Sequence, residues 1–135
     1  AYQDYTIRAQ VTEGLTLAGD LKAGVSEFYA NNGAWPVDET NLGLVAGQKT
    51  GKYVTNVTVA NGLITITYGD QANATILNAT LGLEPGLSAN GDVEWLCGNH
   101  AEPATFLDPA GGAAAAPAAG ATTLLDKYMP AVCRT

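Results

Sequence analysis

Basic residues are scarce in this chain, and their scarcity excludes a large class of functions. Lysine and arginine together number 6 in 135 residues, against 13 aspartates and glutamates, and the formal net charge is −7. The six are scattered from Arg8 to Arg134 and do not gather in one segment. A nucleic-acid surface needs clustered cationic side chains to replace phosphate counterions. We therefore expect no dedicated DNA- or RNA-binding site.

Long apolar runs and catalytic motifs are also missing from the sequence. No stretch approaches the roughly eighteen consecutive apolar residues of a transmembrane helix. The sequence contains no Gly-rich phosphate loop, no cysteines and histidines at zinc spacing, and no serine in a nucleophile elbow. We expect a protein that is not an enzyme, with no catalytic residue, metal ligand or cofactor.

The weaker candidates for chemistry lie close to one another in sequence. His100 is the single histidine, and Glu102 lies nearby, so a general base is conceivable. No nucleophile neighbours it, which favours a solvated loop histidine. Asp92 and Glu94 flank Val93, but their spacing does not resemble a calcium-binding loop. For both candidates, ordinary surface residues without a chemical role are the simpler interpretation.

Three Asn-X-Thr triplets match the acceptor pattern for N-glycosylation. Their asparagines are Asn56, Asn73 and Asn78. Asparagine and threonine are frequent here, so chance matches are expected, and two triplets lie in predicted strands. The sequence leaves glycosylation open.

The two cysteines, Cys97 and Cys133, are most simply a disulfide, because a lone pair in an acidic chain that looks exported favours an oxidising compartment. Two free buried thiols are the alternative. Such a bond would stabilise the fold by about 3–4 kcal/mol in the chain-entropy model. It would also tie the ends of a low-complexity segment rich in Ala, Gly and Pro, residues 108–123, which has little to bury.

The first thirty-odd residues carry a helical pattern. Apolar residues recur at intervals of three and four, which places them on one helix face. This predicted core face consists of Val11, Leu15, Ala18, Leu21, Val25 and Phe28. Asn31, Asn32 and Gly33, followed by Pro36, provide the stop. The predicted helix, residues 1–32, would be about 45 Å long at ~1.5 Å per residue.

The N-terminal half of this helix is expected to be less well covered by the rest of the chain. It carries Tyr2, Tyr5 and Ile7, and the helical pattern starts without a methionine or an N-cap. We expect that a segment ahead of Ala1 has been removed, and that the helix continues upstream or packs against other copies.

After the helix the hydrophobic period changes from 3.6 to 2 residues. Residues 53–60 alternate, Asn61-Gly62 predicts a hairpin turn, and residues 63–68 return as the second strand. Residues 74–81 and 93–97 are predicted as the third and fourth strands.

This order predicts an α+β fold, a single domain over residues 1–135 with the long helix packed on a four-stranded antiparallel sheet. Its parts are the helix, an αβ-loop, an antiparallel meander and a disulfide-bounded region, at residues 1–32, 33–51, 52–97 and 97–133.

Four features of the sequence resemble type IVa pilins of Gram-negative bacteria. The opening AYQDYTIRAQVTEGL is similar to the segment after the hydrophobic leader of those proteins. The meander, Trp95-Leu96-Cys97 and the ending KYMPAVCRT complete the likeness. The layout resembles a major pilin that lacks its N-terminal hydrophobic segment. The Ala/Gly-rich insertion between the cysteines departs from the family, so binding properties of that loop in relatives are not carried over.

The resemblance implies a filament subunit. In such proteins a peptidase removes a leader, the first residue is methylated, and a hydrophobic half-helix, absent here, anchors the subunit in the inner membrane before assembly. Partners would be further copies in a helical homopolymer, the inner-membrane assembly machinery, and a host or surface receptor. The filament would lie outside the cell. Tyr2, Tyr5, Ile7 and Arg8 would line the helix nearest the fibre axis.

Other readings fit the same residues. The resemblance implies roles in twitching motility, adhesion and DNA uptake for a major pilin. A minor or tip pilin would use the 97–133 region as an adhesive surface, although a Gly/Ala-rich loop offers little contact energy. A pseudopilin of a secretion system is the third reading, and the two cysteines argue against it.

The disulfide can be tested by intact mass. We expect the protein to weigh two protons less than the all-thiol form and to take up no alkylating reagent without reductant, because both sulfurs are bonded. Uptake of two alkyl groups by the unreduced protein would contradict the pairing.

Overall fold

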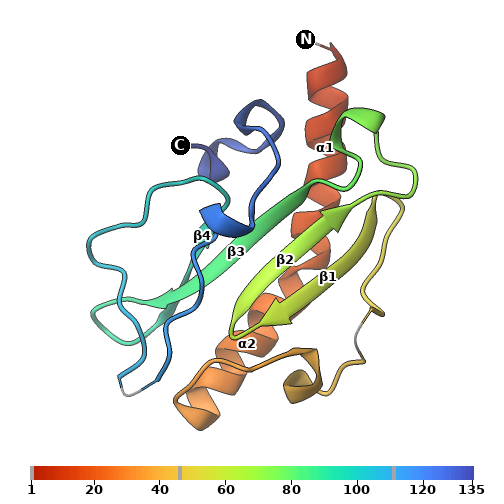
Figure 1. The fold of residues 1–135 in the computed structure, drawn as a ribbon. Helices are drawn as coiled ribbons and strands as arrows, with labels where there is room; N and C mark the ends of the chain where they lie inside the picture. The colour runs from red at the N-terminus through yellow and green to blue at the C-terminus, as the bar shows by residue number, and fades with distance from the viewer. Residues whose placement is uncertain (1, 46, 111) are drawn as a thin grey trace.

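The fold is a long bent helix packed against an antiparallel sheet (Figure 1). The computed structural model describes residues 2–45, 47–110 and 112–135. The helix has two segments, α1 (Tyr2–Leu17) and α2 (Gly19–Asn32). The sheet has the order β1-β2-β3-β4, with β1 at Val54–Ala60, β2 at Leu63–Tyr68, β3 at Thr80–Leu87 and β4 at Val93–Cys97. The predicted α+β class, long helix and four-stranded sheet are confirmed.

The helix bends at Ala18, between the two segments. Backbone hydrogen bonds continue across this point, from Ala18 N to Gly14 O at 3.0 Å and from Lys22 N to Ala18 O at 2.9 Å. Gly19 directly after the bend adds conformational freedom. The helix ends at Gly33, which has a φ of 71° and donates its N–H to Tyr29 O. Its left-handed conformation is the stop expected from the sequence.

The buried face of the helix is more regular than the predicted one. Its members recur at intervals of four and three along both segments and are all fully or almost fully buried. They are Ile7, Val11, Gly14, Ala18, Leu21 and Val25. Leu15 is half-buried beside this face. The expectation for Phe28 is corrected: it is half-buried outside the core cluster, and Tyr29 packs against the core instead.

Gly14 is where the helix comes closest to the sheet. A Cβ at this position would lie 2.5 Å from the Tyr68 hydroxyl oxygen and 2.7 Å from Ile66 Cγ2. The buried Tyr68 hydroxyl donates a hydrogen bond of 2.7 Å to the carbonyl of Val11. Burial, reinforced by the charge of Glu13, raises the pKa of Tyr68, so the hydroxyl keeps its proton. A glycine is therefore required by this contact, because any side chain would displace the ring.

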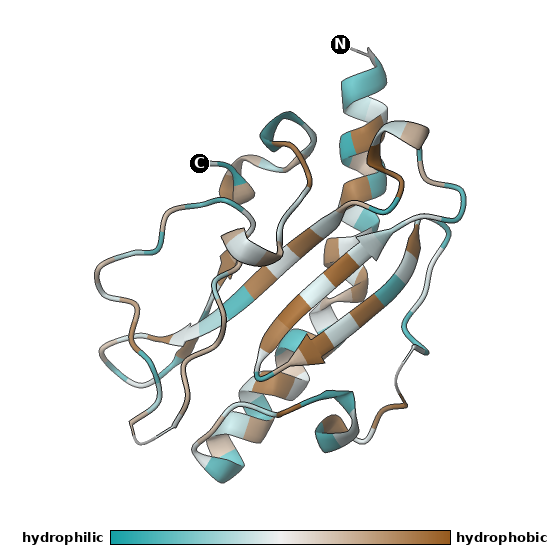
Figure 2. Ribbon diagram, viewed as in Figure 1, coloured by the Kyte–Doolittle hydropathy of each residue, from teal (hydrophilic) through white to brown (hydrophobic). Residues whose placement is uncertain are grey.

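The first hairpin matches the prediction. Asn61 and Gly62 have φ angles of 49° and 87°, as a two-residue turn of this kind requires, and Ala60 pairs with Leu63. A register shift between Val54 and Asn56 changes the alternation in β1. Val54 and Val57 can therefore both face the core, although simple alternation would place them on opposite faces. Figure 2 shows hydrophobic bands along the strands.

The third strand was predicted wrongly. Residues 74–76 form a 3₁₀ turn that buries Ile76, and β3 begins only at Thr80. The strand contains Gly82, Pro85 and Gly86, which disfavour strand structure in sequence. Pro85 lies opposite Trp95 of β4. On the other side of β3 the pairing with β2 ends at Leu83, so a proline is tolerated there without the loss of a hydrogen bond to β2.

The disulfide-bounded region covers the outer face of β3 (Figure 1). The bond between Cys97 and Cys133 is present, with Cα atoms 4.5 Å apart. The Ala/Gly-rich segment was expected to bury little, yet Ala118 is fully buried and Ala115 nearly so. Side chains as small as alanine can fill the narrow space above the sheet.

Two glycine substitutions in the helix should have opposite effects. Gly14→Ala should lower the melting temperature despite the better helix propensity of alanine, because its methyl group collides with Tyr68 and Ile66. Gly19→Ala should raise stability by about 0.5–1 kcal/mol, since nothing lies within 4 Å of its added Cβ. The melting temperatures of both variants, measured by thermal unfolding, test this prediction. A similar change in both would mean that Gly14 does not lie close to the sheet.

Candidate assembly surface

The N-terminal turns of α1 project beyond the end of the sheet, toward the marked N-terminus in Figure 1. They carry the residues predicted to face the axis of a fibre. Tyr5 is 67% exposed, Ile7 is fully buried and Arg8 is half-buried. Tyr2 is the first residue of α1, and its side chain is outside the described part of the chain. Because Ile7 belongs to the core, it shares no exposed surface with Tyr5 and Arg8.

Ile7 was expected to lie in the poorly covered half of the helix, and its full burial contradicts this expectation. It lies four residues before Val11 on the same helix face and belongs to the core cluster. The sheet and the C-terminal residues therefore cover the helix one turn further toward the N-terminus than the sequence indicated.

Arg8 connects the helix to the C-terminal segment. Its Nη1 donates a hydrogen bond of 2.9 Å to the carbonyl oxygen of Lys127, which lies 119 positions later in the sequence. The neighbouring Thr12 hydroxyl donates to the carbonyl of Arg8. The guanidinium thus fixes the position of the C-terminal segment beside α1.

A shallow groove of about 430 Å³ lies between α1 and the C-terminal segment. Its lining residues are Tyr5, Arg8, Ala9, Thr12 and Pro130. Ala9 and Thr12 are exposed and small, so another helix could approach α1 closely here. Ala9, Thr12 and Pro130 were not predicted from the sequence, although Ala9 and Thr12 follow helical spacing on the face opposite the core.

Leu125 and Val132 are exposed apolar side chains of the C-terminal segment, at 59% and 69%. Both lie in the stretch that Arg8 holds against the helix. Like Tyr5, they are apolar side chains that the described part of the chain leaves uncovered.

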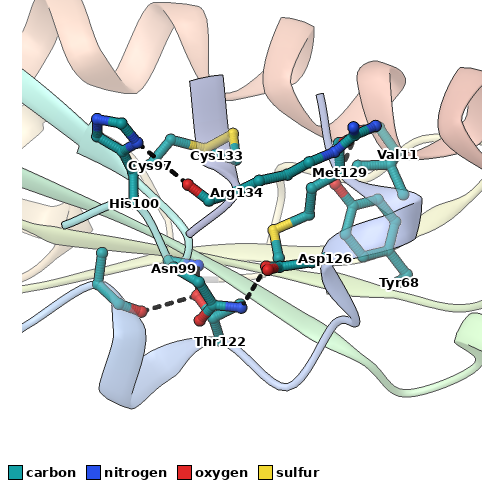
Figure 3. Close-up of a disulfide and its surroundings, with 12 residues drawn as sticks. Val11, Tyr68, Cys97, Asn99, His100, Thr122, Asp126, Met129, Cys133 and Arg134 are labelled. Atoms are coloured by element: carbon teal, nitrogen blue, oxygen red, sulfur yellow. Dashed lines mark hydrogen bonds between the residues drawn. A yellow bond between two sulfur atoms is a disulfide. The ribbon is translucent and has the colours of Figure 1, made fainter. Parts of the chain in front are cut away.

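Hydrogen bonds near the disulfide hold the C-terminal end of the chain in place (Figure 3). The carboxylate of Asp126 accepts a hydrogen bond from Asn99 Nδ2 at 3.0 Å and others from the Thr135 hydroxyl and N–H. The Thr135 hydroxyl, followed by Asn99, lowers the pKa of Asp126. His100 Nδ1 lies 3.1 Å from the carbonyl oxygen of Arg134. This histidine therefore contacts the C-terminal end of the chain.

Residues 2–45, 47–110 and 112–135 contain neither a cluster of metal-binding side chains nor a membrane-spanning helix. No group of three or more His, Cys, Asp or Glu side chains in these ranges could hold a metal ion. Within the same ranges no helix is both long and apolar enough to span a bilayer.

Comparison with known proteins gives the family. The model of the pilin family, described as a bacterial filament protein, matches residues 7–134. The chain belongs to the pilin family. The family consists of structural proteins.

Its relatives include pilins from two genera. It is 42% identical over 139 residues to "Type IV major pilin protein PilE1" of Neisseria gonorrhoeae, covering 99% of this pilin and 73% of the relative. It is 39% identical over 142 residues to a "Fimbrial protein" of Neisseria meningitidis, covering 99% and 79%. "Fimbrial protein EcpC" of Eikenella corrodens is 39% identical over 107 residues, covering 76% and 69%. The predicted resemblance to type IV pilins is confirmed.

The Arg8 contact can be tested in the isolated pilin. Arg8→Ala should lower the free energy of unfolding by about 1 kcal/mol, since the Lys127 carbonyl loses its donor. It should also speed hydrogen exchange in residues 124–135. Gln3→Ala, at an exposed position of the same helix, is the control. Equal behaviour of the two variants in denaturant titration and exchange would mean that Arg8 does not hold the segment.

Proposed function

We propose that this pilin is the major subunit of a type IV pilus, an extracellular filament that serves twitching motility, surface adhesion and DNA uptake. One observation carries the proposal: the N-terminal part of α1 leaves Tyr5 and the groove beside it uncovered. The similarity to proteins named as type IV major pilins supports the choice of a major over a minor subunit.

In this proposal the partner is another copy of the same chain. The groove and Tyr5 form one contact, with Tyr2 and Arg8 beside them nearest the fibre axis. The sheet, the 33–51 loop and the 97–133 region form the outer surface and the lateral contacts. A contact between two different patches of the same chain generates a helical filament when the rotation between neighbouring copies does not close a ring. Many such contacts together give a strong fibre from modest pairwise affinities.

The proposal includes a stage before assembly. The subunit is held in the inner membrane and delivered by the assembly machinery to the growing filament. Once outside the cell, the filament meets a host or surface receptor through its outer face.

Fibres sheared from the source cells test the major-subunit proposal. Mass spectrometry should identify this protein as the dominant band, and a gene deletion should remove both the fibres and twitching. Recovery in trace amounts from fibres that persist after deletion would favour a minor or tip pilin and overturn the proposal.

A charge placed in the groove should prevent assembly without unfolding the subunit. Ala9→Glu puts a carboxylate on an exposed lining residue, so the melting temperature of the soluble domain should stay near that of the wild type. Burial of that unpaired charge between copies would be costly, and fibres should disappear from the cells.

Ala30→Glu, at an exposed position near the end of α2, is the matched control and should leave the fibres intact. Normal fibres from the Ala9→Glu strain would show that the groove is not a contact between subunits. Loss of fibres in both strains would point to a general effect of added charge.

A further inference from the structure

Glu84 is a buried carboxyl group at the centre of the outer face of β3. Its residue is 5% exposed, and its two neighbours on the same face are Gly82 and Gly86. A Cβ on Gly82 would lie 2.7 Å from Ala118 O, and one on Gly86 would lie 2.2 Å from the Phe106 ring. The overlying chain therefore rests directly on the backbone of β3, on both sides of the Glu84 side chain.

The Glu84 side chain forms a hydrogen bond with the chain that lies over β3. Its Oε1 accepts a hydrogen bond of 2.9 Å from the backbone N–H of Ala118, whose side chain is fully buried. Toward the N-terminus, the chain is attached through the backbone pairing of Leu87 with Leu107. We call the described residues between these two attachments, 107–110 and 112–118, the strap. The residues after the strap are held by Thr80, which bonds the backbone of residues 121–124.

The surroundings of Glu84 disfavour a negative charge. Its carboxyl faces Glu102 and Asp108, both on the overlying region, and the sequence has no lysine or arginine between Lys52 and Lys127. Burial is the largest cause that raises the pKa of Glu84, and the charges of Glu102 and Asp108 act in the same direction. The Ala118 N–H acts against them, but the net direction is upward.

We propose that Glu84 is a proton-controlled latch, which holds the strap on β3 more firmly when its carboxyl is protonated and loosens it when the carboxyl ionises. The protonated acid still accepts the Ala118 N–H through its carbonyl oxygen and removes the repulsion from Glu102 and Asp108. The ionised form keeps the hydrogen bond but leaves a buried charge that is repelled by the exposed carboxylates of Glu102 and Asp108. The latch is a property of the domain and does not depend on filament assembly.

The sign of the pH dependence follows from the raised pKa. The open or unfolded chain has the lower pKa, so the full stabilisation is present below that value. It is lost as the pH rises toward and through the pKa of the closed form. Acidification therefore strengthens the latch, whereas carboxylates with lowered pKa values, such as Asp126, weaken their own contacts on acidification.

The first test is a titration of the folded wild-type protein. The Glu84 carboxyl carbon, followed by NMR, should have a higher midpoint than in the urea-unfolded chain. The hydrogen exchange of the Ala118 amide, corrected for its intrinsic rate, should lose protection over the same pH interval. The loss should be about tenfold for each pH unit between the two midpoints. A midpoint at or below the unfolded value would overturn the proposal, and this measurement requires no variant to fold.

The second test removes the proton and keeps the acceptor. Glu84→Gln offers an amide oxygen to Ala118, so protection of Ala118 should become independent of pH and should exceed the wild-type value at neutral pH. Glu94→Gln, on an exposed residue of β4, also removes one carboxylate and should leave the wild-type pH profile unchanged. Asp108→Asn combined with Glu102→Gln should move the Glu84 midpoint downward. Persistence of the wild-type profile in Glu84→Gln would sink the latch.

Discussion

The close approach of α1 to the sheet at Gly14 is the constraint on which the other contacts depend. With no side chain at this point, the Tyr68 ring fits beneath the helix and its hydroxyl bonds to the Val11 carbonyl. That distance sets the depth at which the apolar face of the helix meets Val57, Ile66 and the other inward residues of the strands. A helix held even one methyl group further away would leave gaps along the whole interface, because protein interiors pack as densely as organic crystals.

Polar side chains of α1 then position the loops around this core. The carboxylate of Glu13 accepts hydrogen bonds from the backbone N–H groups of Lys52 and Tyr53, both at 2.8 Å, and so fixes the start of β1. Gln10 accepts from the N–H of Asn73, and Arg8 donates to the carbonyl of Lys127. One helix thus determines where three distant segments lie. It does so through their backbone atoms, which any sequence in those segments would supply.

The features that depend on local pattern were predictable from sequence. The helix, its stop at Gly33, the Asn61-Gly62 hairpin and the fourth strand all follow from periodicity and turn chemistry. β3 was missed because Gly82 and Gly86 are explained only by the chain that lies over them, and Pro85 only by the end of β2. Of the candidate surface, the exposure of Tyr5 fits the prediction, whereas the burial of Ile7 and the groove beside Ala9 depend on the C-terminal segment. That long-range contact leaves no periodic signal.

The strap is attached to β3 through its backbone, so its attachment depends little on the identity of its side chains. Its fixed points are the Leu87–Leu107 bridge at one end and the Ala118 N–H at the other, and both use backbone atoms of the strap. Lengthening a closed loop is inexpensive, at about 0.6 kcal/mol for each doubling. The strap can therefore be lengthened or shortened while the sheet, the disulfide and the helix stay intact, provided that a side chain as small as that of Ala115 still fills the space above β3.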